Sequence, residues 1–543
     1  MDNLIEEQNI IKKDWRSIKL TFALIYPNIY NVGMSCYSIH LLYHLINSRD
    51  DIACERFFIP EKVKYPAQQN GNILKKRIVS LENSIFLSEF DVLGFSIQFE
   101  NDYRNVLWTL EAAGIPLTSN ERQKKAKNQE IVYPLIIAGG PCATSNAMVL
   151  SNYADYFVIG DVEPSLDNLL DLMVESKEKS GKLNLDLARL ASIDNIFIPS
   201  INSECKRSVL KNLDDSSTPI LQIKSIFKDE RTKKKRKNLE FGDTFLLEVN
   251  RGCPYSCKFC ISCHHNAPFR NKTFKNLVET INKATQVQEI KKITFIGSSV
   301  TSHPKFKELC EHAVDKKIDF MIPSIRIDHI SKDLMEVFER GNIKTITIAP
   351  ETGYEKLRYS LGKQITNTQI IETIKIIRDS KIKNIKFYFL IGLPGEWEED
   401  VDAIIELMTE ISELGFDKDS LRVNINPFIP KLNTPYQIYT DYFSKENFTD
   451  LKRKLEKIQK SLIKIPAIKL KIKNIKDLLN KAMIQAIFSL GDKEVSKILL
   501  DYYNMGATYG ALKKAAKNSG FSFDEYFERI KEGYKPLPPS CSI

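Results

Sequence analysis

The 543-residue sequence predicts an α/β protein with a doubly wound parallel sheet, then a partial (β/α) barrel, then a helical C-terminal region. Two observations lead to this prediction. Short apolar segments alternate with segments of helical periodicity in two separate blocks, which is typical of parallel sheets. The last hundred or so residues carry only helical, lysine-rich patterns. We therefore expect four parts, at residues 1–175, 176–240 (a connector), 241–443 and 444–543.

The first block contains four strand-like segments whose ends carry small or polar residues. These segments cover residues 19–26, 91–97, 134–140 and 155–160. Helical patterns between and after them cover residues 32–46, 103–113 and 164–174. Ligands of open parallel sheets bind over the carboxyl ends of the strands. The residues expected at those ends are Tyr30, Ser96, Gln98, Gly139, Gly140, Gly160, Asp161 and Glu163.

The second block alternates in the same way and predicts a parallel barrel or half barrel. Its candidate strands are residues 244–249, 292–297, 319–322, 343–349, 385–391 and 420–425. Its helical patterns include residues 274–288, 304–316, 331–341 and 367–379. Barrels of this kind carry their chemistry at the C-terminal ends of the strands.

Composition limits the possible partners and compartments. Hydrophobic residues make up 43% and charged residues 27%, which is ordinary for a globular protein and excludes a disordered or fibrous chain. The formal charge of +9 is mild for this length, and the basic run at 233–237 has no interleaved aromatic residues, so a nucleic-acid partner is not expected. No signal peptide or apolar run of ~20 residues is present. We expect a cytoplasmic protein without a membrane span, whose cysteines are thiols or metal ligands.

A cysteine-rich loop directly follows the first strand of the second block. Cys253, Cys257 and Cys260 have the spacing C-x3-C-x2-C. Three thiolates can bind three irons of a 4Fe–4S cluster and leave the fourth iron open to a small molecule. A zinc site would need a fourth ligand, which Cys263 or His264 could supply only in a cramped loop. The spacing favours a cluster with an open iron, and the role of Cys263 stays open.

The segment RGCPYSCKFC resembles the cysteine motif of the radical S-adenosylmethionine (SAM) superfamily. The resemblance implies that the open iron binds SAM and that the reduced cluster cleaves SAM to a 5′-deoxyadenosyl radical. It also implies an external electron donor of the flavodoxin or ferredoxin type. The glutamate of the superfamily's Gly-Gly-Glu motif is missing from FIGSSVTSHP. The SAM contacts that the resemblance implies are Phe259, Gly297, Ser298, Ser324, Arg326, Glu351 and Gly392.

The first block has a resemblance of its own. Its phrases YPNIYNVGMS, DVLGFSIQFE, PLIIAGGP and VIGDVEPSL are similar to the cobalamin-binding domain that precedes many radical SAM domains, in a little-characterised subfamily. The motif that donates a histidine to cobalt is absent, and His40 and His44 fit a helix face. A cofactor-free sheet or a dinucleotide site are the alternatives, and no G-x-G-x-x-G supports the latter. The implied cobalamin contacts are Tyr30, Ser96, Gln98, Gly139, Gly140, Gly160 and Glu163.

These resemblances imply a cobalamin-dependent methyltransferase that acts on an unactivated carbon. The alternatives are radical chemistry without methyl transfer, such as carbon–carbon coupling, ring closure or methylthio transfer, and a redox or cobalamin sensor. The substrate stays unknown, although we expect NPFIPKLNTPYQ to shape one wall of the substrate entrance. The remaining cysteines are scattered singly and are expected to be buried apolar residues, namely Cys36, Cys54, Cys142, Cys205, Cys310 and Cys541.

Overall fold

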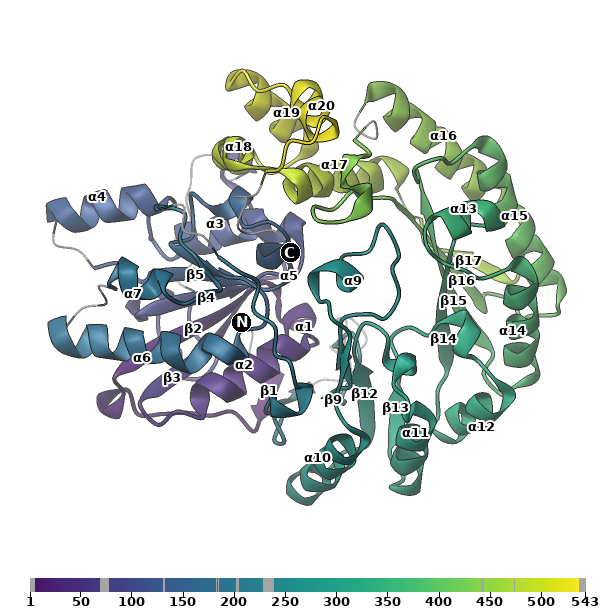
Figure 1. Cartoon of the computed structure of the whole chain (residues 1–543), viewed down its shortest axis with the longest axis horizontal. Helices are drawn as coiled ribbons and strands as arrows, with labels where there is room; N and C mark the ends of the chain where they lie inside the picture. Colours follow the sequence, from purple (N-terminus) through teal and green to yellow (C-terminus); the bar gives the residue numbers. More distant parts are fainter. Residues whose placement is uncertain are drawn as a thin grey trace.

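The computed structural model describes residues 5–68, 78–129, 132–181, 183, 185–201, 205–227, 239–440, 444–472 and 474–536. The basic run at 233–237 and Cys541 lie outside these residues. Figure 1 shows an N-terminal α/β domain beside an open, curved barrel, with the last helices lying above both. This arrangement confirms the predicted fold class. Among the described residues, no helix has both the length and the apolar character that crossing a membrane requires.

The N-terminal domain is built on a six-stranded sheet with the order β3-β2-β4-β5-β6-β7. Its first five strands are parallel, and β7 runs antiparallel at the edge. The chain moves from β2 outward to β3 and then returns to β4, so the winding direction reverses between β2 and β4. Such a reversal opens a crevice at the carboxyl ends of the strands, where ligands bind. The strand bounds are Leu20–Ile29 (β2), Ile52–Ile59 (β3), Val92–Ser96 (β4), Leu135–Gly139 (β5), Tyr156–Val158 (β6) and Ile196–Phe197 (β7).

Helices cover both faces of this sheet. On one face, α2 (Tyr37–Asn47) and α6 (Glu163–Ser180) share a core with the strands. On the other face, α3 (Tyr103–Ala112) packs together with the C-terminal helices in a common core. The Tyr153 hydroxyl donates to the Ser496 carbonyl oxygen at 2.7 Å across that contact. The C-terminal helices are α17 (Ile475–Leu490), α18 (Lys493–Asn504), α19 (Tyr509–Asn518) and α20 (Phe523–Lys531).

Two features of the first domain extend beyond the expected segments. Strand β3 was not expected, and it carries the fully buried Arg56, which pairs with Glu82 at 2.6 Å and with Glu7 at 2.7 Å. Glu7 lies in β1 (Ile5–Gln8), which pairs with β8 (Lys224–Phe227) of the connector. The connector also supplies β7, and α6 continues past residue 175 to Ser180. The N-terminal segment and the connector are thus parts of the first domain's structure.

The second domain is a partial barrel of parallel strands with helices on its outer side. Its two sheets have the orders β13-β12-β9 and β14-β15-β16-β17, and the Ile325 amide donates to the Thr347 carbonyl oxygen at 2.9 Å between them. The strands are β9 (Phe245–Glu248), β12 (Lys292–Ile296), β13 (Asp319–Met321), β14 (Thr345–Glu351), β15 (Asn384–Ile391), β16 (Leu421–Pro427) and β17 (Ile468–Leu470). The covering helices are α10 (Phe274–Val287), α11 (Phe306–Asp315), α12 (Lys332–Arg340), α14 (Asn367–Asp379), α15 (Glu398–Glu413) and α16 (Lys445–Leu462).

Buried and half-buried residues alternate along the barrel strands, and this alternation gives the barrel an inner side that is not part of the apolar core. Residues of β14 and β15 alternate strictly between buried and half-buried, as expected for strands with one face against the helices. The half-buried residues face the concave side, which is turned toward α9 (Ile261–His265) and the N-terminal domain in Figure 1. The open edge of the barrel is therefore closed off by the first domain.

Candidate active site

The predicted cluster cysteines lie on one loop between β10 (Asn250–Arg251) and α9. Gly252 begins this loop with a φ of 75°, and a Cβ on it would lie 2.5 Å from the Asn266 carbonyl oxygen. Only glycine fits such a left-handed, crowded position. The Lys258 amide donates to the Leu361 carbonyl oxygen at 2.9 Å, and the Lys258 carbonyl accepts from the Tyr436 amide at 3.3 Å. The loop is thus held by the segments that follow β14 and β16.

Burial and neighbouring groups shift the pKa values of the three cysteine thiols. Burial raises the pKa of Cys253, and it raises the pKa of Cys257 to about 11. The neighbouring Cys260 also raises the pKa of Cys253 and of Cys257, whereas Lys363 lowers the pKa of both. Three thiolates that lie close together beside a cation are a suitable donor set for a 4Fe–4S cluster. No three His, Cys, Asp or Glu side chains within the described residues are close enough together to hold a single metal ion.

Cys263 points back toward the cluster loop. Its thiol donates to the carbonyl oxygens of Cys257 at 3.4 Å and Cys260 at 3.2 Å. A hydrogen bond from the Cys263 thiol is also the main reason why the pKa of Cys260 falls to about 6. In this position Cys263 supports the loop as a hydrogen-bond donor.

Two expected SAM contacts have their positions set by other side chains. The guanidinium of Arg326 is paired with Asp328 at 2.9 and 2.8 Å. Glu351, at the end of β14 with a φ of 70°, is paired with Lys363 at 2.8 Å. Lys363 therefore joins Glu351 to the surroundings of the cluster thiols. Each of these side chains has its own ion-pair partner, and no hydrogen bond or ion pair joins Glu351 to Arg326.

The other expected SAM contacts lie at neighbouring strand ends. Gly297 follows β12, and a Cβ on it would lie 2.2 Å from Asn250 Oδ1, so this glycine permits the close packing of β10 against β12. The Gly392 amide donates to Glu396 Oε1 at 3.0 Å, and Lys454 Nζ lies 2.9 Å from the same oxygen. Ser298 follows Gly297, Ser324 is exposed after β13, and Phe259 packs against the barrel core.

One cavity of about 470 Å³ joins the two domains. Its walls on the N-terminal side include six of the seven residues expected to contact cobalamin, namely Ser96, Gln98, Gly139, Gly140, Gly160 and Glu163. Its walls on the barrel side include Glu248, Asn250, Arg251, Gly297 and Ser298. The cavity therefore connects the strand ends of the first sheet with the beginning of the cluster loop and with part of the expected SAM site.

The inner part of this cavity is apolar. It runs between the first sheet and helices α2 and α6, where it is lined by Phe22, Leu24, Leu41, Leu166 and Leu169. Polar groups gather at its mouth, where Gln98 Nε2 donates to Ser96 Oγ at 3.2 Å. A ligand with a polar rim and an apolar appendage fits this division.

Three residues near the first sheet lie elsewhere than at the cavity. The Tyr30 hydroxyl donates to Glu7 Oε1 at 2.6 Å, so Tyr30 supports the pairing of β1 with the connector. His40 is buried, and its Nε2 bonds to the Met34 carbonyl oxygen at 3.0 Å. His44 Nε2 lies 3.2 Å from Ser217 Oγ. Both histidines lie in α2, as predicted, and both side chains bond to other groups of the protein.

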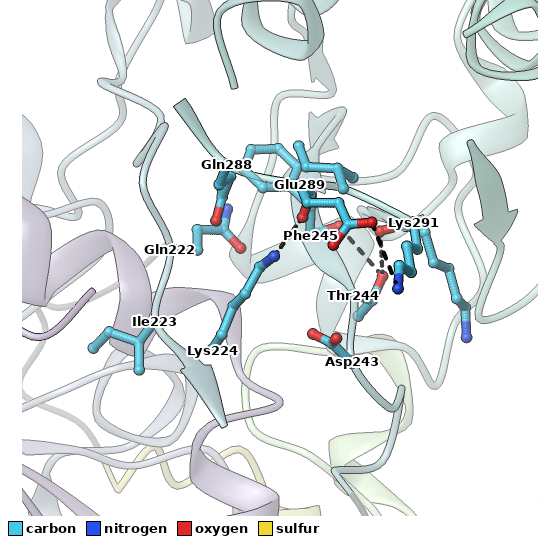
Figure 2. Close-up of a pocket in the computed structure, with 11 residues that line it drawn as sticks. Gln222, Ile223, Lys224, Asp243, Thr244, Phe245, Gln288, Glu289 and Lys291 are labelled. Carbon is cyan, nitrogen blue, oxygen red and sulfur yellow. Dashed lines mark hydrogen bonds and ion pairs between the residues drawn. The ribbon is translucent and has the colours of Figure 1, made fainter. Parts of the chain in front are cut away.

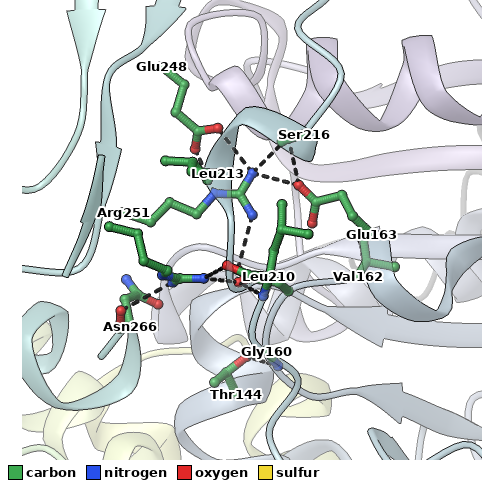
Figure 3. A network of polar contacts seen from close by, with 12 residues as sticks. Thr144, Gly160, Val162, Glu163, Leu210, Leu213, Ser216, Glu248, Arg251 and Asn266 are labelled. Carbon is green, nitrogen blue, oxygen red and sulfur yellow. Dashed lines mark hydrogen bonds and ion pairs between the residues drawn. The ribbon is translucent and has the colours of Figure 1, made fainter. Parts of the chain in front are cut away.

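Sequence reasoning missed the ion network at the junction of the domains (Figure 3). Arg251 Nη2 donates to Glu163 Oε1 at 2.6 Å, and Arg251 Nη1 donates to Asp161 Oδ1 at 3.1 Å. The only signal in the sequence is that this arginine immediately precedes the Gly-Cys of the cysteine motif. Asp161 and Glu163 lie about ninety positions earlier in the chain, so their pairing with Arg251 was not visible in the sequence.

A second hollow lies at the opposite, amino-terminal end of the barrel strands (Figure 2). Its volume is about 60 Å³, and it is lined by Gln222, Lys224 and Thr244 among others. The Gln222 side chain accepts from the Leu246 amide at 2.9 Å and donates to the Leu246 carbonyl oxygen at 2.8 Å. The hollow is far too small for a nucleotide-sized ligand, and these bonds attach the connector to β9.

Comparison with known families supports the resemblances noted in the sequence. A family model described as "Radical SAM proteins, N-terminal" matches residues 38–199, and the model of the radical SAM superfamily matches residues 247–408. The first stretch covers the first sheet from β3 onward, and the second covers the cluster loop and the barrel as far as β15. The chain belongs to the radical SAM superfamily.

Individual relatives and solved structures match further parts of the chain. An uncharacterized protein of Methanocaldococcus jannaschii is 26% identical over 493 residues, which are 91% of this chain and 93% of the relative. An uncharacterized methyltransferase of Pyrococcus horikoshii is 24% identical over 53% of this chain and 60% of its own length. The structure of the radical SAM methyltransferase TsrM from Kitasatospora setae, with cobalamin and a 4Fe–4S cluster bound, aligns with a TM-score of 0.51 at 12% identity and 77% coverage of both chains. This chain and TsrM share a fold.

Proposed function

We propose that this chain is a cobalamin-dependent radical SAM methyltransferase that acts on an unactivated carbon. The observation that carries the proposal is the single cavity of about 470 Å³ lined by both the first sheet and the barrel. Methyl transfer between two cofactors requires them to meet in one space that excludes water. The shared fold with TsrM, whose structure contains cobalamin and a cluster, supports the same function.

Membership in the superfamily implies a 4Fe–4S cluster and SAM, which together with cobalamin would supply the radical and the methyl group. Cys253, Cys257 and Cys260 would hold the cluster, and Lys363 lies beside them as a compensating charge. Ser96 and Gln98 would donate to polar groups on the rim of cobalamin. An external flavodoxin- or ferredoxin-type protein would provide the electrons.

Several residues would orient the ligands without taking part in bond changes. Gly139 has no side chain between its strand end and the cavity, so a planar macrocycle could approach the backbone there. Glu396 accepts hydrogen bonds from the Gly392 amide and from Lys454, and these bonds hold the turn after β15 that would contact SAM. His40 and His44 are engaged elsewhere, and we expect cobalt to have no protein histidine ligand.

The decisive experiment is anaerobic reconstitution followed by product analysis. Protein with an intact cluster and bound cobalamin should convert SAM, under reducing conditions, to both S-adenosylhomocysteine and 5′-deoxyadenosine. Mass spectrometry distinguishes these products. If cluster-loaded protein takes up no cobalamin from excess hydroxocobalamin, the methyltransferase proposal fails. A radical SAM enzyme without cobalamin then becomes the better hypothesis, and methylthio transfer or ring closure would be tested next.

A further inference from the structure

The junction between the two domains contains an unusually dense set of charges close to the cluster loop. We define the Arg251 network as Arg251, Arg270, Glu248, Asp161 and Glu163. Figure 3 labels Arg251, Glu248 and Glu163 of this network. Arg251 lies two positions before Cys253, whereas Asp161 lies in the loop after β6 of the first sheet and Glu163 is the first residue of α6. The network therefore joins the beginning of the cluster loop to the strand ends that line the cavity.

Arg251 binds carboxylates from both domains with one guanidinium. Its Nε and Nη2 donate to the two oxygens of Glu248 at 2.8 and 3.0 Å, within the barrel. Its Nη1 and Nη2 donate to Asp161 at 3.1 Å and to Glu163 at 2.6 Å, in the N-terminal domain. Only the planar fork of arginine can hold three carboxylates in fixed directions at once.

Asp161 also relieves a repulsion that the local strands create. Arg251 in β10 stands directly opposite Arg270 in β11 (Arg270–Asn271), and like charges placed opposite each other destabilise a strand pair. Asp161 accepts from Arg251 with one oxygen and from Arg270 Nη1 at 2.6 Å with the other. The two arginines of the β10–β11 pair, which flanks the cluster loop, therefore share the Asp161 carboxylate only when the N-terminal domain is in place.

The segment of the N-terminal domain that carries Asp161 and Glu163 is held in place by its own backbone and side-chain contacts. Gly160 has a φ of 90°, and a Cβ on it would lie 2.2 Å from the Ser208 carbonyl oxygen. The Leu210 amide donates to Asp161 Oδ2 at 2.8 Å, and Ser216 Oγ donates to Glu163 Oε1 at 2.9 Å. The side chains of Arg251, Asp161 and Glu163 are only 14%, 17% and 11% exposed, so water screens these interactions weakly.

Other contacts keep the domains together independently of this network. Lys431 pairs with Glu100 of the first domain, and Asn433 Nδ2 donates to the Ser145 carbonyl oxygen at 3.5 Å. The C-terminal helices add a shared apolar core on the far face of the first sheet. Loss of the Arg251 contacts should therefore loosen the cluster loop without separating the domains.

From this geometry we propose that Arg251 is a positioning residue that sets the distance and orientation of the cluster relative to the cobalamin side of the cavity. The inference rests on the proposed function. It differs from that function in assigning a role to a side chain that binds no metal, and this role can be tested in the protein with or without cobalamin.

The first test needs no cobalamin and uses full-length, cluster-loaded protein. Hydrogen exchange of residues 252–265 should be several-fold faster in Arg251→Lys and faster again in Arg251→Gln, because lysine keeps the charge but loses the fork. Exchange in α17 and α18 should stay unchanged. The control is Arg122→Lys, which removes a guanidinium that pairs with Asp155 at 2.8 Å within the first domain. Unchanged exchange in the cluster loop of both Arg251 variants would overturn the inference.

The second test measures the geometry directly. In wild-type protein with reduced cluster and cob(II)alamin, the two paramagnets should interact, and electron paramagnetic resonance should show faster relaxation of the cobalt signal. Arg251→Lys should keep the iron and cobalamin contents but weaken or broaden this interaction, whereas Arg122→Lys should not. An unaltered interaction in Arg251→Lys would refute the positioning role. If wild-type protein binds no cobalamin, the proposed function fails, and the exchange experiment alone decides the inference.

Discussion

The guanidinium carbon of Arg326 lies 3.5 Å from the centre of the Tyr255 ring. This contact joins the segment after β13 to the cluster loop, because Tyr255 stands between Cys253 and Cys257. The Tyr255 hydroxyl is also 2.7 Å from His329 Nε2. Stacking on the ring and pairing with Asp328 hold the Arg326 side chain next to the place where SAM would bind.

Replacing Arg326 by lysine should weaken SAM binding without loss of iron. Lysine keeps the charge but cannot form the planar fork or stack on Tyr255. Loss of one charge-assisted hydrogen bond of ~1.5 kcal/mol corresponds to about a tenfold lower affinity. Calorimetric titration of cluster-loaded protein with SAM measures this change. Arg340→Lys, at the exposed end of α12, is the matched control, and an unchanged affinity in Arg326→Lys would place Arg326 outside the pocket.

Two cysteine variants should separate a cluster ligand from its neighbour. Cys257→Ala should lose the cluster, because two thiolates do not fix its geometry. Cys263→Ala removes only a thiol that donates to backbone carbonyl oxygens, so the cluster should remain. Iron and sulfide content after anaerobic reconstitution measures both results. A full cluster in Cys257→Ala would contradict the ligand assignment, and its loss in Cys263→Ala would indicate a closed site with four cysteine ligands.

Filling the cavity from its wall should reduce cobalamin binding. A Cβ at Gly139 would have no contact closer than 3.8 Å, so Gly139→Leu should not strain the backbone but should project into the cavity. We expect the affinity for cobalamin to fall about tenfold or more, because the ligand must displace a side chain. Absorbance titration with hydroxocobalamin provides the measurement. Gly510→Leu in α19, also free of close contacts, is the control, and equal affinities in the two variants would show that the cofactor binds elsewhere.

Stability in mild acid should depend on His40. Burial lowers the pKa of His40 to about 4, from an ordinary value of about 6.5. The unfolded chain therefore binds a proton at a higher pH than the folded chain does, so this contribution to stability is complete above pH ~6.5 and is lost progressively toward pH ~4. The apparent melting temperature of His40→Gln should vary less over this range than that of the wild type. An identical pH dependence would show that His40 is not buried in its neutral form.

Local patterns predicted most strands and helices but missed the short strands β1, β8 and β17 and the longer strand β3. The residues Glu55 and Arg56 interrupt its apolar pattern, and both charges are nevertheless buried. Arg56 is neutralised by Glu82 and Glu7, and Glu55 accepts from the Trp15 indole at 2.8 Å. Buried charges are tolerated when they are paired, but the partners come from other segments, so no local window reveals the strand.

The candidate site was likewise predicted from the sequence only in part. The spacing of Cys253, Cys257 and Cys260 lies within one loop, so the sequence alone predicts a shared ligand set. The pairing of Arg251 with Asp161 and Glu163 joins residues about ninety positions apart, and nothing in the local sequence indicates it. The C-terminal helices were expected as helices, whereas their packing on the first sheet was not.

The sequence by itself therefore determined the two blocks of alternating strands and helices, the cysteine loop and the glycines at strand ends. These features depend on periodicity, conformational freedom and spacing, all of which act within a few residues. Only the tertiary structure decided that the carboxyl ends of the first sheet and of β9 and β12 in the barrel face one cavity, and that an arginine beside the cluster loop binds the first domain. The physical reason is that burial and charge neutralisation depend on which distant segments meet, and this is settled by packing of the whole chain.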